Sequence, residues 1–102
     1  MDIQRLRTLT TNMLHTEIRN VYVDLEMITG QDEVMTHEIP NFLRAAKPWL
    51  RRVVTDERFW DNKYDPTHIG EFELPEPTEE DRQEMLKIYD ELPDPLFGWE
   101  MI

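Results

Sequence analysis

The sequence contains no cysteine and no serine, and it has only three glycines. Without cysteine there is no disulfide, no thiolate zinc site and no thiol nucleophile. Serine and cysteine supply most covalent nucleophiles of hydrolases and transferases, so their joint absence argues against those enzymes. The glycines stand far apart, at positions 30, 70 and 98, which excludes a phosphate-binding glycine loop. We therefore expect a protein that is not an enzyme and needs no cofactor.

A long apolar run is also missing. No stretch approaches the roughly 20 apolar residues of a transmembrane helix, so we expect no membrane contact. The N-terminal residues MDIQRLRTLT carry no apolar core of the secretory type. A cytoplasmic location fits this pattern and the missing cysteine.

Hydrophobic periodicity predicts a small helical protein. A length of 102 residues with 39% hydrophobic residues is typical of a single domain. Apolar residues recur every three or four positions over 9–29, which predicts one helix ending at Gly30. Residues 3–9 could extend this helix, form a separate lead-in or form a short strand. The predicted fold class is mainly α, with three to four helices and at most a short edge strand or hairpin.

The remaining expected elements follow in order along the chain. We expect a helix over 41–54, a helical turn over 55–60, an edge strand over 70–74 and a helix over 79–92. Pro48 interrupts the second helix, and we favour a break there over a bend because proline removes a helix hydrogen bond. Thr78 and Asp81 have the spacing of a capping box at the start of the last helix.

Charge is unevenly distributed along the chain, whose formal net charge is −11. Residues 71–102, the acidic C-terminal third, hold eleven Asp and Glu against two Lys and Arg. Such a segment should repel nucleic acid and attract basic surfaces. It could imitate a phosphate backbone, or it could simply be a solvated helix face. The candidate partner-binding residues are Glu79, Glu80, Asp81, Glu84, Asp90 and Glu91.

The stretch RAAKPWLRR, residues 44–52, gathers four of the scarce cations. On a helix, Arg44, Lys47 and Arg51 would form a ridge on one face. Pairing with the protein's own acidic third is the simplest explanation of this ridge. The alternative is an oligomer that sequesters a phosphorylated small molecule, such as a nucleotide, since arginine binds such oxygens well. The candidate anion-binding residues are Arg44, Lys47, Trp49, Arg51 and Arg52.

Other candidate groups carry weaker signals. The three histidines, at positions 15, 37 and 68, each have a carboxylate nearby but no metal-ligand spacing, so we expect surface or capping roles and no metal. An aromatic group could stack a base, but core packing is the preferred interpretation. Its members are Trp49, Phe59, Trp60, Tyr64 and Trp99. Apolar residues near the C-terminus either pack that end of the chain against the domain or form an exposed surface that binds a partner or a second copy. They are Leu96, Phe97, Trp99, Met101 and Ile102.

The runs LRTLTTNMLHTE (residues 6–17) and MTHEIPNFLRAAKPWLRRVVTDERFW (residues 35–60) resemble small uncharacterised accessory proteins of tailed bacteriophages. The resemblance implies a protein that binds and blocks a host component, possibly one of its defence proteins, in the host cytoplasm. It assigns no functional residue. We therefore expect a small acidic inhibitor that binds a host protein and is itself an oligomer, without direct nucleic-acid binding.

Overall fold

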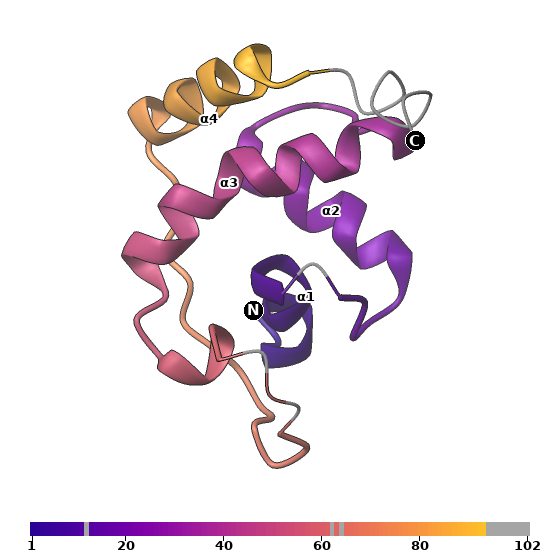
Figure 1. Cartoon of the computed structure of the whole chain (residues 1–102), viewed down its shortest axis with the longest axis vertical. Coiled ribbons are helices and arrows are strands. Elements are labelled where there is room, and N and C mark those ends of the chain that lie inside the picture. The colour runs from indigo at the N-terminus through magenta and orange to yellow at the C-terminus, as the bar shows by residue number, and fades with distance from the viewer. Residues whose placement is uncertain (12, 62, 64, 94–102) are drawn as a thin grey trace.

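The computed structural model describes residues 1–11, 13–61, 63 and 65–93 (Figure 1). Helices dominate this part of the chain: α1 (Ile3–Thr11), α2 (Ile18–Thr29), α3 (Ile39–Val53) and α4 (Glu79–Glu91). Two short 3-10 turns, η1 (Thr36–Glu38) and η2 (Glu57–Phe59), lie between them. The mainly α fold expected from the sequence is confirmed. Within the described residues, no helix has both the length and the apolar composition needed to cross a membrane.

The longest helix, α3, is the centre of the fold. It crosses the middle of Figure 1, with α4 on one side and α1 and α2 on the other, and it packs against all three. Its buried side chains pack against these neighbours, whereas its remaining side is exposed at Arg44, Pro48, Arg51 and Arg52. The core includes Leu6, Leu9, Val21, Leu25, Ile28, Phe42, Ala46, Trp49, Leu50, Phe59 and Met85.

The prediction of one helix over 9–29 is wrong, because the chain forms two helices there. Threonines explain the break: Thr11 donates to the carbonyl oxygen of Arg7 (2.7 Å), and Thr8 accepts a hydrogen bond from the backbone N–H of His15 (2.9 Å). Such side-chain bonds replace helix hydrogen bonds. Leu14, one of the apolar residues whose spacing predicted the single helix, is consequently 59% exposed. Residues 3–9 belong to the separate helix α1, whose first turn is capped by Asp2 (2.9 Å to the backbone N–H of Gln4).

The expected break at Pro48 is also wrong, because α3 continues through the proline. Pro48 itself is exposed, while Ala45, Ala46 and Trp49 on either side of it are buried. An interior proline costs a helix about 3 kcal/mol. Burial of apolar side chains on both sides of Pro48 outweighs that cost. This burial depends on tertiary packing, so the local sequence does not predict it.

Residues 54–78 connect α3 to α4 along the edge of the molecule. The expected strand over 70–74 is reduced to one antiparallel bridge between Asp2 and Glu71. Backbone hydrogen bonds join Ile3 to Gly70 (2.9 Å) and Phe72 to Met1 (2.7 Å). The pairing cannot extend further because helix α1 begins at Ile3. The predicted helical turn over 55–60 is confirmed as η2, with Asp56 as its cap.

Both predicted helix boundaries marked by caps are confirmed. Gly30 ends α2 in the left-handed region, with φ of 76°, and donates to the carbonyl oxygen of Glu26. Thr78 and Asp81 form a reciprocal capping box at the start of α4, with bonds of 3.1 and 2.9 Å. The bond from the Thr78 backbone N–H lowers the pKa of Asp81.

Candidate protein-binding surface

Helix α4 is fixed on the domain by one buried face. Met85 is 2% exposed, and the ring of Tyr89 stacks on Phe42 of α3 with centroids 4.1 Å apart. Arg82 reaches α2, where it donates to the carbonyl oxygens of Met27 (2.8 Å) and Ile28 (3.4 Å). These contacts orient the helix so that its other face is exposed to solvent.

The exposed face of α4 carries most of the predicted partner-binding residues. We call its exposed carboxylates the acidic surface: Glu79, Glu80, Glu84, Asp90 and Glu91. Asp81, the sixth predicted residue, is only 22% exposed and belongs to the capping box. Among the described residues, no ion pair involves Glu80, Asp90 or Glu91. Their negative charge is therefore available to a partner.

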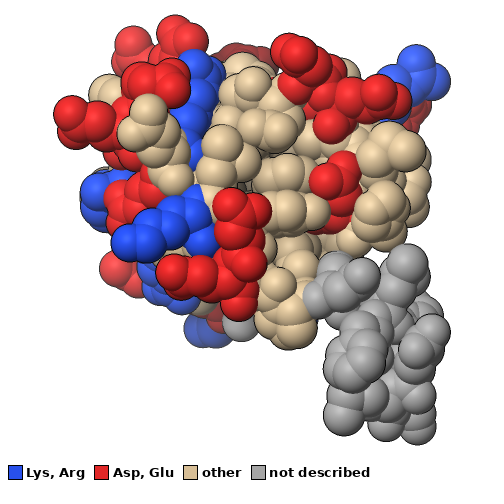
Figure 2. Space-filling view, turned by 90° about the horizontal axis from the view of Figure 1, so that it is seen from above, with Lys and Arg blue, Asp and Glu red and all other residues tan. Residues whose placement is uncertain are grey.

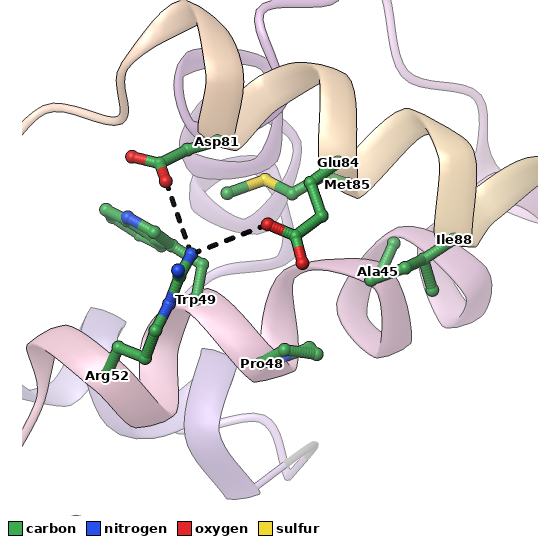
Figure 3. Close-up of a pocket in the computed structure, with 8 residues that line it drawn as sticks. All are labelled: Ala45, Pro48, Trp49, Arg52, Asp81, Glu84, Met85 and Ile88. Carbon is green, nitrogen blue, oxygen red and sulfur yellow. Dashed lines mark hydrogen bonds and ion pairs between the residues drawn. The ribbon is translucent and has the colours of Figure 1, made fainter.

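Arg52 of α3 is the cation that reaches this helix from below (Figure 3). Its Nη2 lies 3.2 Å from Oδ1 of Asp81 and 3.9 Å from Oε2 of Glu84. The arginine and Glu84 are both more than half exposed, so this bridge contributes little stability. The space between α3 and α4 at this point holds only about 10 Å³, so it is not a ligand site.

The structure does not assemble the five predicted anion-binding residues into one open surface. Trp49 is 3% exposed and packs in the core, where it cannot stack on a ligand. Arg52 points to α4, as described above. Arg44 and Arg51 remain exposed, with Arg51 4.3 Å above the ring of Trp60. The anion-binding hypothesis stays a prediction, now carried mainly by two residues.

Lys47 has a structural contact instead of an open position on the ridge. Its Nζ donates to the carbonyl oxygens of Leu9 (2.9 Å) and Thr10 (3.0 Å) at the end of α1. Helix ends leave such carbonyls without helical partners, so the ammonium caps α1 from α3. Burial, and secondarily the charge of Arg51, lowers the pKa of Lys47 to about 8.

Basic residues are therefore mostly engaged in contacts, and acidic ones are mostly exposed. Figure 2 views the molecule from the side of α4 and shows acidic and basic side chains intermixed over one part of this face. A broad band without charge lies beside them, and further acidic side chains lie beyond it. Pairing with the protein's own acids is found for Arg52, which lies beside the predicted ridge. Among the described residues, no ion pair joins Arg44 or Arg51 of the ridge to an acid.

A groove of about 290 Å³ opens between α1, α2 and the segment that leads to α4. Val23 and Met27 of α2 form one wall, and Leu74 lies on the other. Arg5 and Asp24 lie at the groove as an ion pair, with the Nε of Arg5 3.1 Å from Oδ2 of Asp24. We call this feature the α2 groove.

Sequence reasoning missed the α2 groove, although one signal was available. Val23 and Met27 are four residues apart and lie off the stripe of Val21, Leu25 and Ile28 that faces the core. Apolar residues outside the core stripe of a helix indicate a second, exposed apolar face. Val23 is 54% exposed and Met27 is 41% exposed.

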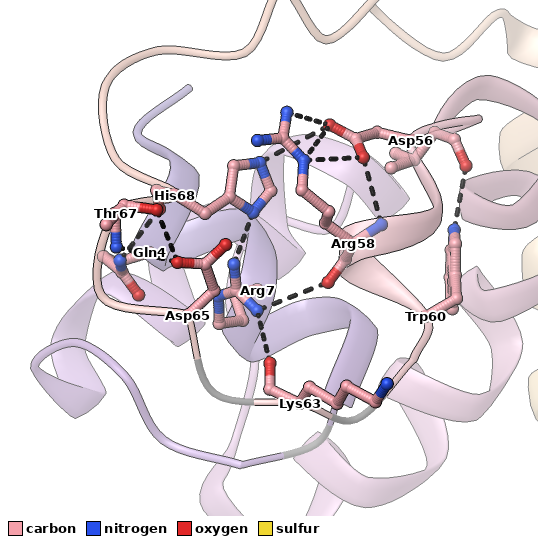
Figure 4. A network of polar contacts seen from close by, with 10 residues as sticks. Gln4, Arg7, Asp56, Arg58, Trp60, Lys63, Asp65, Thr67 and His68 are labelled. Atoms are coloured by element: carbon pink, nitrogen blue, oxygen red, sulfur yellow. Dashed lines mark hydrogen bonds and ion pairs between the residues drawn. The ribbon is translucent and has the colours of Figure 1, made fainter.

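A buried polar network near η2 was also missed (Figure 4). Arg7 of α1 is 2% exposed, and its guanidinium donates to Nδ1 of His68, which is 3% exposed. The same guanidinium donates to the backbone carbonyls of Arg58 and Lys63, both at 3.4 Å. Nε2 of His68 lies 3.5 Å from Oδ2 of Asp56. The network ties α1 to the connection between α3 and α4.

Burial and the charges of this network shift the pKa values of His68 and Asp56. Burial, together with the nearby charges of Arg58 and Arg7, lowers the pKa of His68, although Asp56 and Asp65 oppose the effect. Hydrogen bonds from Arg58 lower the pKa of Asp56 to about 2. Neutral His68 accepts at Nδ1 and carries its proton on Nε2. The role is structural, because the imidazole is enclosed.

The three histidines end in three different environments. His68 is buried, His37 is exposed in η1, and His15 lies in the connection between α1 and α2, where its pKa is lowered by burial. The expectation of a surface or capping role is wrong for His68, because its side chain is buried in the network with Arg7. Within the described residues, no three side chains of the histidine, cysteine or acidic types come together as metal ligands.

The prediction that the aromatic group packs in the core holds for its members among the described residues. Phe59 is fully buried and Trp49 nearly so, while the indole of Trp60 donates to the carbonyl oxygen of Val54 (2.9 Å). Tyr64 and the apolar C-terminal residues, including Trp99, lie outside the described residues.

Comparison with known proteins gives one match. Residues 1–60 match a domain of unknown function, DUF7736. No curated protein and no solved structure matches the chain. The matched residues span α1 to α3 and η2, which form most of the core, and they cover more than half of the chain. This protein is therefore a member of the DUF7736 family.

Proposed function

We propose that this protein is a non-enzymatic binding protein whose acidic surface docks on a basic surface of another protein. The observation that carries the proposal is the uncompensated charge of α4. Glu80, Asp90 and Glu91 are exposed without an ion partner among the described residues, while Arg52 and Arg82 are already engaged. An excess of one charge on a rigid helix speeds encounter with an oppositely charged surface and disfavours other partners.

The partner we propose is a bacterial host protein, following the resemblance to accessory proteins of tailed bacteriophages. By covering a basic surface, this protein would prevent the partner from binding its own ligand there. The partner would thus be inhibited without any catalysed reaction. A defence protein that binds nucleic acid has such a surface, because phosphate contacts require clustered lysine and arginine. The net charge of −11 and the acidic α4 disfavour direct nucleic-acid binding by this chain.

The test uses two charge-reversal variants of the full chain. Asp90→Lys with Glu91→Lys reverses charge in the last turn of α4, where the helix dipole favours cations, so the fold should tolerate it. The matched control, Asp32→Lys with Glu33→Lys, makes the same change at two exposed positions of the α2–α3 connection. Circular dichroism verifies that both variants keep their helical content.

Immobilised wild-type protein and both variants are exposed to bacterial lysate at low ionic strength. We expect a protein that wild type and the control retain and the α4 variant loses. With that protein purified, its association rate should fall steeply as salt rises. Equal retention by all three, or retention of nothing, would overturn the proposal.

A further inference from the structure

We propose that the α2 groove is the anchor site for the partner, and that it takes apolar side chains of a protein segment flanked by lysine or arginine. The inference rests on the proposed function and deepens it, because it names the contact that holds the partner after charge has brought it close. Val23, Met27 and Leu74 are the residues that would receive the anchor.

An anchor outside the acidic surface is needed on physical grounds. Exposed ion pairs contribute little net affinity, whereas apolar side chains buried at the centre of an interface contribute most of it. None of the large apolar side chains found exposed in the described part of the chain lies on α4. The partner must therefore bury apolar area elsewhere, and the α2 groove offers such area where Arg82 of α4 contacts Met27.

The walls of the groove suit a varied apolar contact. Val23 and Met27 are about half exposed and stand one helical turn apart on α2, facing Leu74 across the opening. Methionine adapts its shape to different partners at low cost. A volume of about 290 Å³ lies just below the roughly 300–1,000 Å³ of enclosed small-molecule sites, so the groove fits side chains of a docked segment better.

Charge at the groove selects the residues that flank the anchor. Two cations lie at the groove: Arg5, which is paired with Asp24, and the N-terminal ammonium of Met1, which lies 3.3 Å from the carboxylate of Glu71. The carboxylates of Asp2 and Glu71 also act on Arg5, and the Glu71 side chain is 76% exposed. The three carboxylates outnumber these two cations by one, so the field at the opening favours a cationic segment over an anionic one.

The groove and the acidic surface are continuous. Arg82 of α4 donates to the carbonyl oxygen of Met27 in the groove wall (2.8 Å), and its Nη2 also lies 3.6 Å from the carboxylate of Glu76. Leu74 of the facing wall is four residues before Thr78, the cap of α4. A segment anchored in the groove can therefore extend directly over the acidic carboxylates.

A random displayed-peptide library, selected against the wild-type protein, supplies the probe. The groove variant is Val23→Thr with Met27→Gln, which changes polarity at nearly constant volume. The matched control is Ile69→Thr with Met13→Gln, at two side chains that are 68% and 63% exposed outside the groove. Dissociation constants of selected peptides are measured by calorimetry for wild type, both of these variants and the α4 charge variant.

We expect selected peptides to share an apolar residue flanked by lysine or arginine. The groove variant should weaken their binding at least tenfold, and the control should change it less than twofold. Peptides weakened by the α4 variant but not by the groove variant would overturn the anchor while keeping the proposed function. Selection of acidic peptides, or of none, would overturn the anchor as well. So would dimerisation of the protein alone that the groove variant abolishes, because a second copy would then fill the groove.

Discussion

The guanidinium of Arg7 donates a hydrogen bond to Nδ1 of His68, and both side chains are almost completely buried. The contact requires an unprotonated Nδ1, because an imidazolium has no lone pair there. A protonated His68 would also place a second positive charge beside Arg7. The stability of the domain should therefore depend on the protonation of His68, and His15, whose pKa is also lowered by burial, adds a contribution of the same sign.

We expect the free energy of unfolding to fall as pH drops from 7.5 to 5. The pKa of His68 is lowered in the folded state, so below pH 6.5 the unfolded chain binds more protons than the folded one, and stability decreases. One linked proton gives a slope of at most about 1.4 kcal/mol per pH unit. Urea unfolding at several pH values measures it.

His68→Gln should flatten this pH dependence, whereas the control His37→Gln, at an exposed histidine, should leave it unchanged. The glutamine variant will be less stable than wild type at pH 7.5, because the contact with Arg7 changes. An identical pH slope in His68→Gln and wild type would show that the buried pair does not govern acid sensitivity.

Lys47 predicts a pH dependence of the same sign on the alkaline side. Its pKa is about 8 in the folded state against 10.5 when unperturbed, so between these values the unfolded chain holds the extra proton and stability rises with pH. The gain should be well below 1.4 kcal/mol per pH unit, because the side chain is only half-buried. Wild type and Lys47→Met are compared by urea unfolding at pH 8.0 and 9.5. Parallel pH dependence in the two proteins would contradict the assignment.

Gly30→Ala should destabilise the domain by about 1–2 kcal/mol through the left-handed backbone alone. An added Cβ would also lie 2.9 Å from Cδ of Arg82, so the arginine must shift from its contacts with α2. A double-mutant cycle with Arg82→Ala separates the two effects. In the Arg82→Ala background the cost of Gly30→Ala should decrease towards the backbone value, and an unchanged cost would exclude the steric contribution.

Pro48→Ala should raise the free energy of unfolding by about 1–3 kcal/mol, because it restores a donor inside α3 and removes the clash of the proline ring. Little packing is lost, since Pro48 is exposed. Thermal and urea unfolding of the single variant measure the effect. A less stable variant would mean that the proline ring supports the contact of α3 with α4.

Local signals in the sequence predicted much of the fold. Gly30, Asp56 and the pair of Thr78 and Asp81 marked element boundaries correctly, because capping is decided within one turn of the chain. The interpretation of the aromatic group as core residues likewise holds for Trp49 of α3. Position on a helix face follows from spacing alone when the helix is correctly placed.

The failures came from side-chain hydrogen bonds near a helix end and from tertiary contacts. Leu14 has the spacing of the core stripe, but side-chain hydrogen bonds of Thr8 and Thr11 end the helix before it. Pro48 should break a helix in isolation, and burial on both sides keeps it intact. His68 lies 61 residues from Arg7, and no local pattern predicts that long-range contact.

Helix α4 lies beyond the residues that match the family, yet it closes the core over Phe42 and Trp49. A truncation after residue 60 would strip Met85 and Tyr89 from α3 and remove the imidazole that accepts from Arg7. The fragment would expose the apolar surface of α3, and the guanidinium of Arg7 would lose its imidazole acceptor. We therefore expect it to be recovered as insoluble aggregate. The edge of sequence similarity in this chain is therefore not the edge of an autonomous folding unit.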